Sequence, residues 1–310
     1  MLYFMVASTI LSIIGALYIA AFRKANKILR QLIQVNNKNI SIVNASLKRE
    51  CFEVETLDKH KVTGYIAKLY ENPKGMIVLC HNLGGSKEAM LRYAKFLCEA
   101  GYAAAGFDFL NHGESDKINK VYFDHSPELA AVIQYIRSTG YGGLPMGIFA
   151  LSMGTVAGIM HSSVDSRIKA VVLEGGPFLY VNDYLEYVAG LNGIKNQLFK
   201  SAFAKLCFLI TDLREIEVKT TAALRKLRET PTLFIQGEKD FMNPPGSTQK
   251  ALSIMNSPGA EYWMIQGAYH LTGLRIAKEV YKERVVSFFD KNLADVQVRT
   301  DNTYKERIII

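Results

Sequence analysis

Cysteine is scarce in this sequence of 310 residues, and its four copies are widely spaced. None belongs to a CxxC pair or to a cysteine–histidine spacing typical of zinc sites. Cys80 and Cys98 lie inside apolar runs, where a free cysteine packs as a small hydrophobic side chain. The sequence therefore predicts reduced structural thiols rather than disulfides or a metal site, which fits a reducing compartment.

Repeats and low-complexity tracts are also missing, which argues against a solenoid and against a disordered chain. Hydrophobic residues make up 49% of the sequence and charged residues 21%, as in ordinary globular proteins. The length allows one large domain with a deep core or two small domains.

Acidic residues are rare where basic ones gather. Between Arg23 and Glu50 the sequence has seven basic residues and one acidic residue, which accounts for +6 of the net charge of +8. The remainder is close to balanced. A basic patch beside a hydrophobic segment suits anionic lipid headgroups better than DNA, so we expect a membrane-lipid partner and no nucleic-acid partner.

Charged residues are absent from Tyr3 to Phe22, a stretch about as long as a helix needs to cross a bilayer. A cleaved signal peptide is the competing interpretation, but no basic residue precedes the run and no small-residue cleavage site follows it. We expect a transmembrane anchor at 1–22 and a basic stalk at 23–49. The positive charge follows the span, which predicts a single-pass protein with its bulk in the cytoplasm.

Eight strand-like runs follow the stalk, and stretches of helical periodicity separate most of them. This alternation predicts an α/β domain over 50–295, with a mostly parallel sheet and helices on both faces. The later runs are continuously apolar, as expected of strands buried on both sides. The runs lie at 51–57, 62–70, 75–81, 103–109, 146–151, 170–175, 232–237 and 261–267. The tail at 296–310 has no predicted role.

A long segment without a clear strand interrupts the alternation at about 178–229. Within it, apolar residues recur at helical spacing, including Phe199, Phe203, Leu206 and Ile210. A plain core-packing helix would explain this spacing equally well. Because helices inserted at this point lie over the carboxyl ends of the strands, where ligands bind, we interpret the segment as a lid.

Ser152 follows the strand-like run at 146–151 and precedes a helix-like stretch. Its small neighbours, Ala150 and Gly154, permit a sharp strand-to-helix turn that exposes the hydroxyl. The pattern small-x-Ser-x-Gly is frequent by chance, so a nucleophile needs partners elsewhere in the chain. We expect Ser152 to be a catalytic nucleophile.

Two further residues follow the last two strands. Asp240 lies in a loop after the run at 232–237, and His270 lies just past the run at 261–267. Alone, the former is typical of a turn and the latter of a surface loop. Nevertheless, the chain order Ser152, Asp240, His270 is that of α/β-type serine hydrolases, so we expect a catalytic triad. Glu174, after the run at 170–175, is the reserve candidate for the triad acid.

The glycine-rich stretch CHNLGGS at 80–86 follows another strand. Such a turn offers a backbone N–H, and we expect those of Leu83 and Met153 to form an oxyanion hole. A simple turn with Ser86 as helix N-cap is compatible with the same residues.

These motifs resemble the α/β-hydrolase superfamily over roughly residues 50–295. The resemblance rests on HNLGGS, ALSMG, GEKD, GAYH and DFLNHGESD, the last at 108–116, where we expect Asp108, His112 and Ser115 to hydrogen-bond the loop beside the site. With the anchor, the chain resembles membrane-tethered lipase-like members, and more loosely the monoacylglycerol-lipase and Bem46-like groups. It departs from them at Asn82 and Ala150, where glycine is usual.

The resemblance implies a membrane-anchored serine hydrolase that cleaves an acyl ester or thioester of a lipophilic substrate through an acyl-enzyme. It implies no metal and no organic cofactor. An acyltransferase on the same fold and a non-catalytic membrane-bound binding module remain open as alternatives. The sequence does not indicate an oligomeric state.

Overall fold

The computed structural model describes residues 2–33, 47–118 and 122–305. The expected strands occur, each within three residues of its predicted bounds. They are β1 Arg49–Glu55, β2 Lys61–Ala67, β3 Met76–Cys80, β4 Ala103–Phe107, β5 Met146–Leu151, β6 Ile168–Glu174, β7 Thr232–Gly237 and β8 Ala260–Ile265.

Helices connect these strands. Their bounds are α1 Leu2–Ile33, α2 Leu91–Glu99, α3 Ser126–Ser138, α4 Met153–Ser162, α5 Val181–Leu191, α6 Gln197–Ile210, α7 Leu213–Lys226, α8 Pro245–Met255 and α9 Gly273–Lys305, with short 3₁₀ turns at Lys87–Met90 and Leu227–Glu229. The backbone of α9 leaves helical geometry at Lys278, where two helical stretches meet.

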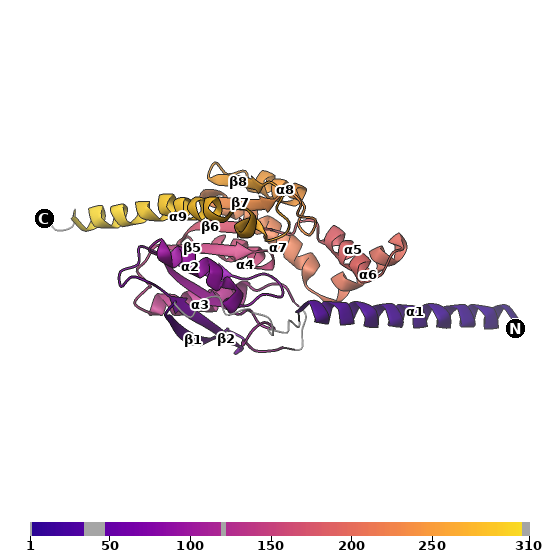
Figure 1. Ribbon diagram of the computed structural model, residues 1–310. Coiled ribbons are helices and arrows are strands. Elements are labelled where there is room, and N and C mark those ends of the chain that lie inside the picture. Colours follow the sequence, from indigo (N-terminus) through magenta and orange to yellow (C-terminus); the bar gives the residue numbers. More distant parts are fainter. Residues whose placement is uncertain (1, 34–46, 119–121, 306–310) are drawn as a thin grey trace.

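The strands form one sheet in the order β1-β2-β4-β3-β5-β6-β7-β8 (Figure 1). β1 pairs with β2 and β2 with β4 in antiparallel fashion, whereas all pairings from β4 to β8 are parallel. The carboxyl ends of β3 to β8 therefore meet at one edge of the sheet, where an α/β protein holds its ligands.

Both faces of the sheet are covered, which explains why the central strands are apolar without interruption. In β5, Ile148 and Ala150 point into the core beneath α3, α4 and α8. Phe149 and Leu151 point to the opposite face, where they join side chains of α2 and α9. Every residue of β3, β5 and β7 is buried, so the edge that carries the site is rigidly held.

The segment between β6 and β7 forms three helices, α5 to α7, at the carboxyl edge of the sheet (Figure 1). The predicted apolar face of α6 is buried at Phe203, Leu206 and Cys207, whereas Phe199 is exposed. The segment predicted to be a lid, called the lid below, is thus a helical layer with its own packed interior, and it contributes part of the wall of the cavity described below.

The first helix, α1, runs through both the predicted anchor and the start of the predicted stalk. Its later part packs on α6 of the lid, and Ala25 and Ile28 are buried there. Within the described residues, no helix combines the length and apolar character needed to cross a membrane, so the predicted transmembrane anchor lacks support in the structure. The stalk residues 34–46 lie outside the described residues.

Candidate active site

Ser152 occupies the tight turn between β5 and α4. Its backbone has φ 49° and ψ −115°, a conformation that side chains with a Cβ rarely adopt and that costs about 1–3 kcal/mol. The turn is held from behind, because the Ser152 N–H donates to the Glu174 carbonyl at 2.8 Å. This hydrogen bond to the end of β6 holds Ser152 in its strained backbone conformation. In that conformation the hydroxyl lies clear of the strand.

Gly154 is required by the close approach of α4 to β3. A Cβ at this position would lie 2.7 Å from the carbonyl oxygens of both Cys80 and His81. Those atoms are backbone and cannot move aside cheaply. The second small residue of the predicted motif thus allows the start of α4, and with it Ser152, to sit directly against the end of β3.

The structure brings the three predicted triad residues together at the carboxyl edge. His270 Nε2 lies 3.0 Å from Ser152 Oγ, and His270 Nδ1 lies 2.8 Å from Asp240 Oδ2. The other carboxylate oxygen, Oδ1, accepts the N–H groups of Met242 at 3.0 Å and Asn243 at 2.9 Å. Asp240 is therefore fixed as a hydrogen-bond acceptor, and the histidine ring is held between it and the serine.

Glu174, the reserve acid, does not hydrogen-bond to the histidine. Its carboxylate accepts the Tyr281 hydroxyl at 2.6 Å and the Gly273 N–H at 3.1 Å. Burial raises the pKa of this carboxyl. Glu174 therefore fastens the beginning of α9, three residues beyond His270, to the end of β6, and the partner of His270 is Asp240.

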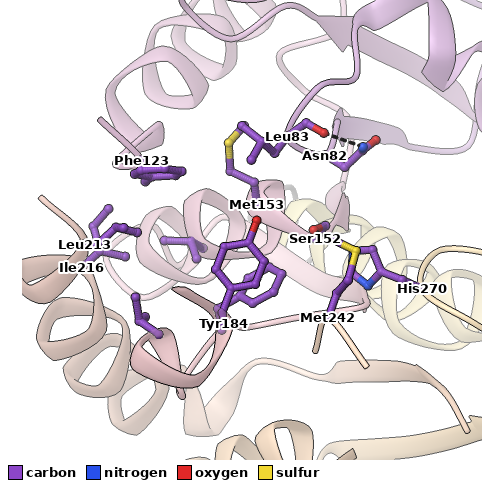
Figure 2. Close-up of a pocket in the computed structure, with 13 residues that line it drawn as sticks. Asn82, Leu83, Phe123, Ser152, Met153, Tyr184, Leu213, Ile216, Met242 and His270 are labelled. Atoms are coloured by element: carbon purple, nitrogen blue, oxygen red, sulfur yellow. Dashed lines mark hydrogen bonds between the residues drawn. The ribbon is translucent and has the colours of Figure 1, made fainter. Parts of the chain in front are cut away.

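The two predicted oxyanion donors both border the cavity next to Ser152 (Figure 2). Among the described residues, neither the Leu83 N–H nor the Met153 N–H donates a hydrogen bond. Asn82 Nδ2 donates to the Leu83 carbonyl at 2.8 Å, which orients the peptide that follows Leu83. Two backbone donors without a protein acceptor beside a serine hydroxyl are what an oxyanion site requires.

A cluster of buried histidines supports the predicted oxyanion loop, residues 81–86, from behind. The Gly84 N–H points at His112 Nε2 at 3.3 Å, and the Phe109 N–H donates to His81 Nε2 at 3.0 Å. Burial lowers the pKa of His81 to about 4 and that of His112 to about 2. Both rings are thus neutral, which leaves these nitrogens free to accept.

Asp108 organises the neighbouring loop, as expected from the DFLNHGESD motif. It accepts the Lys87 N–H at 2.7 Å and the Glu114 N–H at 2.9 Å, while the Ser115 hydroxyl donates to its carbonyl at 2.7 Å. Burial alone would raise its pKa, but the Lys87 ammonium at 2.7 Å lowers it overall. Sequence reasoning missed Lys87, because a lysine at the start of a helical stretch usually faces water.

An apolar cavity of about 270 Å³ opens at Ser152 and His270. Figure 2 shows Phe123, Leu213 and Ile216 at the end of the cavity away from His270. The lid supplies part of the wall through α5 and α7. The remaining lining residues are Asn82, Leu83, Met153, Val156, Phe178, Val181, Tyr184 and Met242.

No cluster of three or more histidine, cysteine or carboxylate side chains that could hold a metal ion occurs in the part of the chain that the structure describes. The carboxyl edge of the sheet offers a serine hydroxyl, an imidazole, a carboxylate and backbone N–H groups beside an apolar cavity.

Part of the sequence is similar to known proteins. Residues 71–216 match the family described as serine aminopeptidase, S33. An uncharacterized 31.7 kDa protein from the traX–finO intergenic region of Escherichia coli is 27% identical over 122 residues. That match covers 36% of this chain and 43% of the relative, less than half of either.

Solved structures match over much more of the chain. The esterase Pf2001 of Pyrococcus furiosus superposes with a TM-score of 0.68 at 20% identity, covering 84% of this chain and 96% of the esterase. The α/β hydrolase GrgF of Penicillium matches with a TM-score of 0.61 at 17% identity, covering 80% and 100%. A dienelactone hydrolase of Anabaena variabilis matches with a TM-score of 0.55 at 17% identity, covering 80% and 99%.

Proposed function

Because the chain has the α/β-hydrolase fold, we propose that it is a serine hydrolase that cleaves an acyl ester or thioester bond of a lipophilic substrate. The observation that carries this proposal is the hydrogen-bonded series Ser152–His270–Asp240 at the mouth of an apolar cavity. Each member follows a different parallel strand, so the sheet sets their mutual distances.

In the proposed reaction, Ser152 Oγ attacks the substrate carbonyl while its proton passes to His270 Nε2. Asp240 holds the Nδ1–H tautomer and stabilises the imidazolium that forms. His270 then returns the proton to the leaving alcohol or thiol, which departs as the acyl-enzyme forms. Water attacks the acyl-enzyme in the second half-reaction, with His270 as the base, and releases the acid and free Ser152.

Negative charge that develops on the carbonyl oxygen has two backbone partners. The N–H groups of Leu83 and Met153 are available for it, and Met153 is also the first residue of α4. A helix N-terminus adds a favourable partial positive charge at the same point. This arrangement supports acyl transfer, in which the transition state is an oxyanion.

The lining of the cavity favours an acyl chain as the group it takes. Most of its side chains are aliphatic, aromatic or methionine, and the polar ones gather at the Ser152 end. Among the described lining residues there is no carboxylate that would bind the α-amino group of a peptide. We therefore favour an esterase over an aminopeptidase, the activity in the name of the matched family.

Labelling with a fluorophosphonate probe tests the nucleophile. The parent chain is expected to be labelled and Ser152→Ala is not, while the exposed Ser253→Ala serves as the matched control and keeps the label. The rate of p-nitrophenyl ester hydrolysis in Ser152→Ala and His270→Ala is expected to fall by about four to six orders of magnitude. Parent-like hydrolysis by purified Ser152→Ala would overturn the proposal.

A further inference from the structure

A second cavity, of about 350 Å³, lies between α1 and the lid, outside the candidate active site. Helix α1 contributes Ala21 and Lys24, and the lid contributes the loop before α6 and the first two turns of that helix. The lid residues at the cavity are Gly193, Ile194, Lys195, Asn196, Phe199, Ala202 and Phe203. None of these residues takes part in the chemistry proposed above.

The walls of this cavity are of two kinds. Phe199, Ala202 and Phe203 present apolar surface, and Phe199 is 66% exposed although it belongs to the apolar face of α6. Lys24 and Lys195 place two exposed ammonium groups at the same cavity. Neither ammonium forms an ion pair with any residue that the structure describes. The cavity therefore matches a ligand with an anionic head and an apolar body.

The place of the cavity along α1 indicates which ligand this is. Before residue 22 the exposed side chains of α1 are uncharged and mostly apolar, among them Leu11 and Ile19, and this part of the helix projects beyond the body (Figure 1). From Arg23 onwards the helix is basic. An apolar surface that turns cationic within one helical turn corresponds to the boundary between acyl chains and headgroups at a lipid surface.

We propose that the α1–α6 cavity binds an anionic phospholipid of a membrane surface. The phosphate lies between the ammonium groups of Lys24 and Lys195, and the acyl chains pass over Phe199 toward the apolar part of α1. Ala25 and Ile28 hold α1 against the lid, so both walls of the site are fixed to the body. This inference is independent of the proposed hydrolysis, because it uses other residues and another readout.

Flotation of the 310-residue chain with phosphatidylcholine vesicles, with and without phosphatidylglycerol, tests the site. Ala202→Trp fills the cavity without changing charge, and the exposed Ala222→Trp on α7 is its control. Lys24→Glu with Lys195→Glu reverses the two cations. The control pair, Lys169→Glu with Lys226→Glu, makes the same charge change at the opposite edge of the sheet.

The parent is expected to bind phosphatidylglycerol vesicles more tightly than pure phosphatidylcholine. This preference falls by about tenfold or more in Ala202→Trp and in the Lys24/Lys195 pair, but not in either control. Thermal melts of all variants check that they are folded. If only the Lys24/Lys195 pair loses the preference for phosphatidylglycerol, the chain is attracted to the vesicle surface by its general charge. If all variants bind equally, the chain adheres to vesicles through the apolar part of α1. Either outcome overturns the proposal.

Discussion

At the scale of single residues, His112 must stay neutral for its Nε2 to accept the Gly84 N–H behind the predicted oxyanion loop. Burial, and then the neighbouring imidazoles of His81 and His125, lower its pKa to about 2. The unfolded chain takes up a proton near pH 6.5 that folded His112 does not. Stability is therefore complete above pH 6.5 and declines as the pH falls below it.

Urea unfolding of the parent and of His112→Gln at pH 7 and pH 5 measures this contribution. Glutamine keeps an acceptor oxygen but does not titrate. Between these pH values the parent is expected to lose about 2 kcal/mol more unfolding free energy than the variant. An equal loss in both proteins would contradict a neutral buried His112. His60→Gln, at a half-buried histidine before β2, is the control.

At the scale of helices and strands, much of the fold can be predicted from the sequence because its strands are short apolar runs between clear turn residues. β5 and β7 have the predicted bounds, and the resemblance to the α/β-hydrolase superfamily is confirmed at the level of the fold. The insertion of β4 between β2 and β3 could not be predicted, because pairing depends on contacts far apart in sequence.

Helix boundaries were harder to predict where tertiary contacts decide them. Sequence reasoning separated residues 1–22 from 23–49 at the change from apolar to basic. The structure instead continues α1 to Ile33, since Ala25 and Ile28 find a partner surface on α6. Composition alone does not reveal such a contact. Ala25 and Ile28 of the basic stretch are buried, and the stretch as a whole still reads as basic.

The start of α7 ties the lid to the cavity. Asp212 accepts the Phe123 N–H at 2.9 Å and the Asp124 N–H at 3.1 Å, and Phe123 lines the far end of the cavity. In Asp212→Ala both N–H groups lose their acceptor, which costs about 1–3 kcal/mol each where they are buried. We expect kcat/KM to fall more for long-chain than for short-chain p-nitrophenyl esters.

Asp212→Asn is the matched control for this prediction, because its amide keeps one acceptor oxygen. It is expected to retain most of the long-chain activity. If the alanine and asparagine variants lose the same activity on both substrates, the hydrogen bonds of Asp212 do not shape the cavity beside Ser152.

At the scale of the whole molecule, the cavity is assembled from segments between residues 82 and 270. The hydrogen-bonded series Ser152–His270–Asp240 could be predicted, because its three residues follow strands and keep a characteristic chain order. The cavity wall could not be predicted. Phe123 comes from a loop and Leu213 and Ile216 from α7, and local sequence patterns do not determine how these segments pack together. Its depth is a property of the assembled fold.

Under the proposed function, filling the far end of the cavity shortens the acyl chain that is accepted. Ile216→Trp adds bulk to a cavity of about 270 Å³ at a point remote from Ser152. We expect kcat/KM for long-chain p-nitrophenyl esters to fall at least about tenfold, with short-chain hydrolysis and fluorophosphonate labelling retained. If the dependence of kcat/KM on acyl-chain length is unchanged in Ile216→Trp, the acyl group does not occupy this cavity. Ile254→Trp on α8, away from the cavity, controls for added bulk.

The strained backbone of Ser152 has a consequence for the stability of the entire chain. Glycine has no Cβ and therefore adopts φ 49° and ψ −115° without strain. The free energy of unfolding, measured in urea, is therefore expected to be about 1 kcal/mol higher for Ser152→Gly than for Ser152→Ala. Both variants lack the hydroxyl, so the comparison isolates the effect of the backbone. Equal free energies of unfolding would show that the backbone at position 152 is not strained. If Ser152 acts as proposed, the turn exchanges stability for activity, since the residue that folds best at position 152 is one that cannot attack a carbonyl.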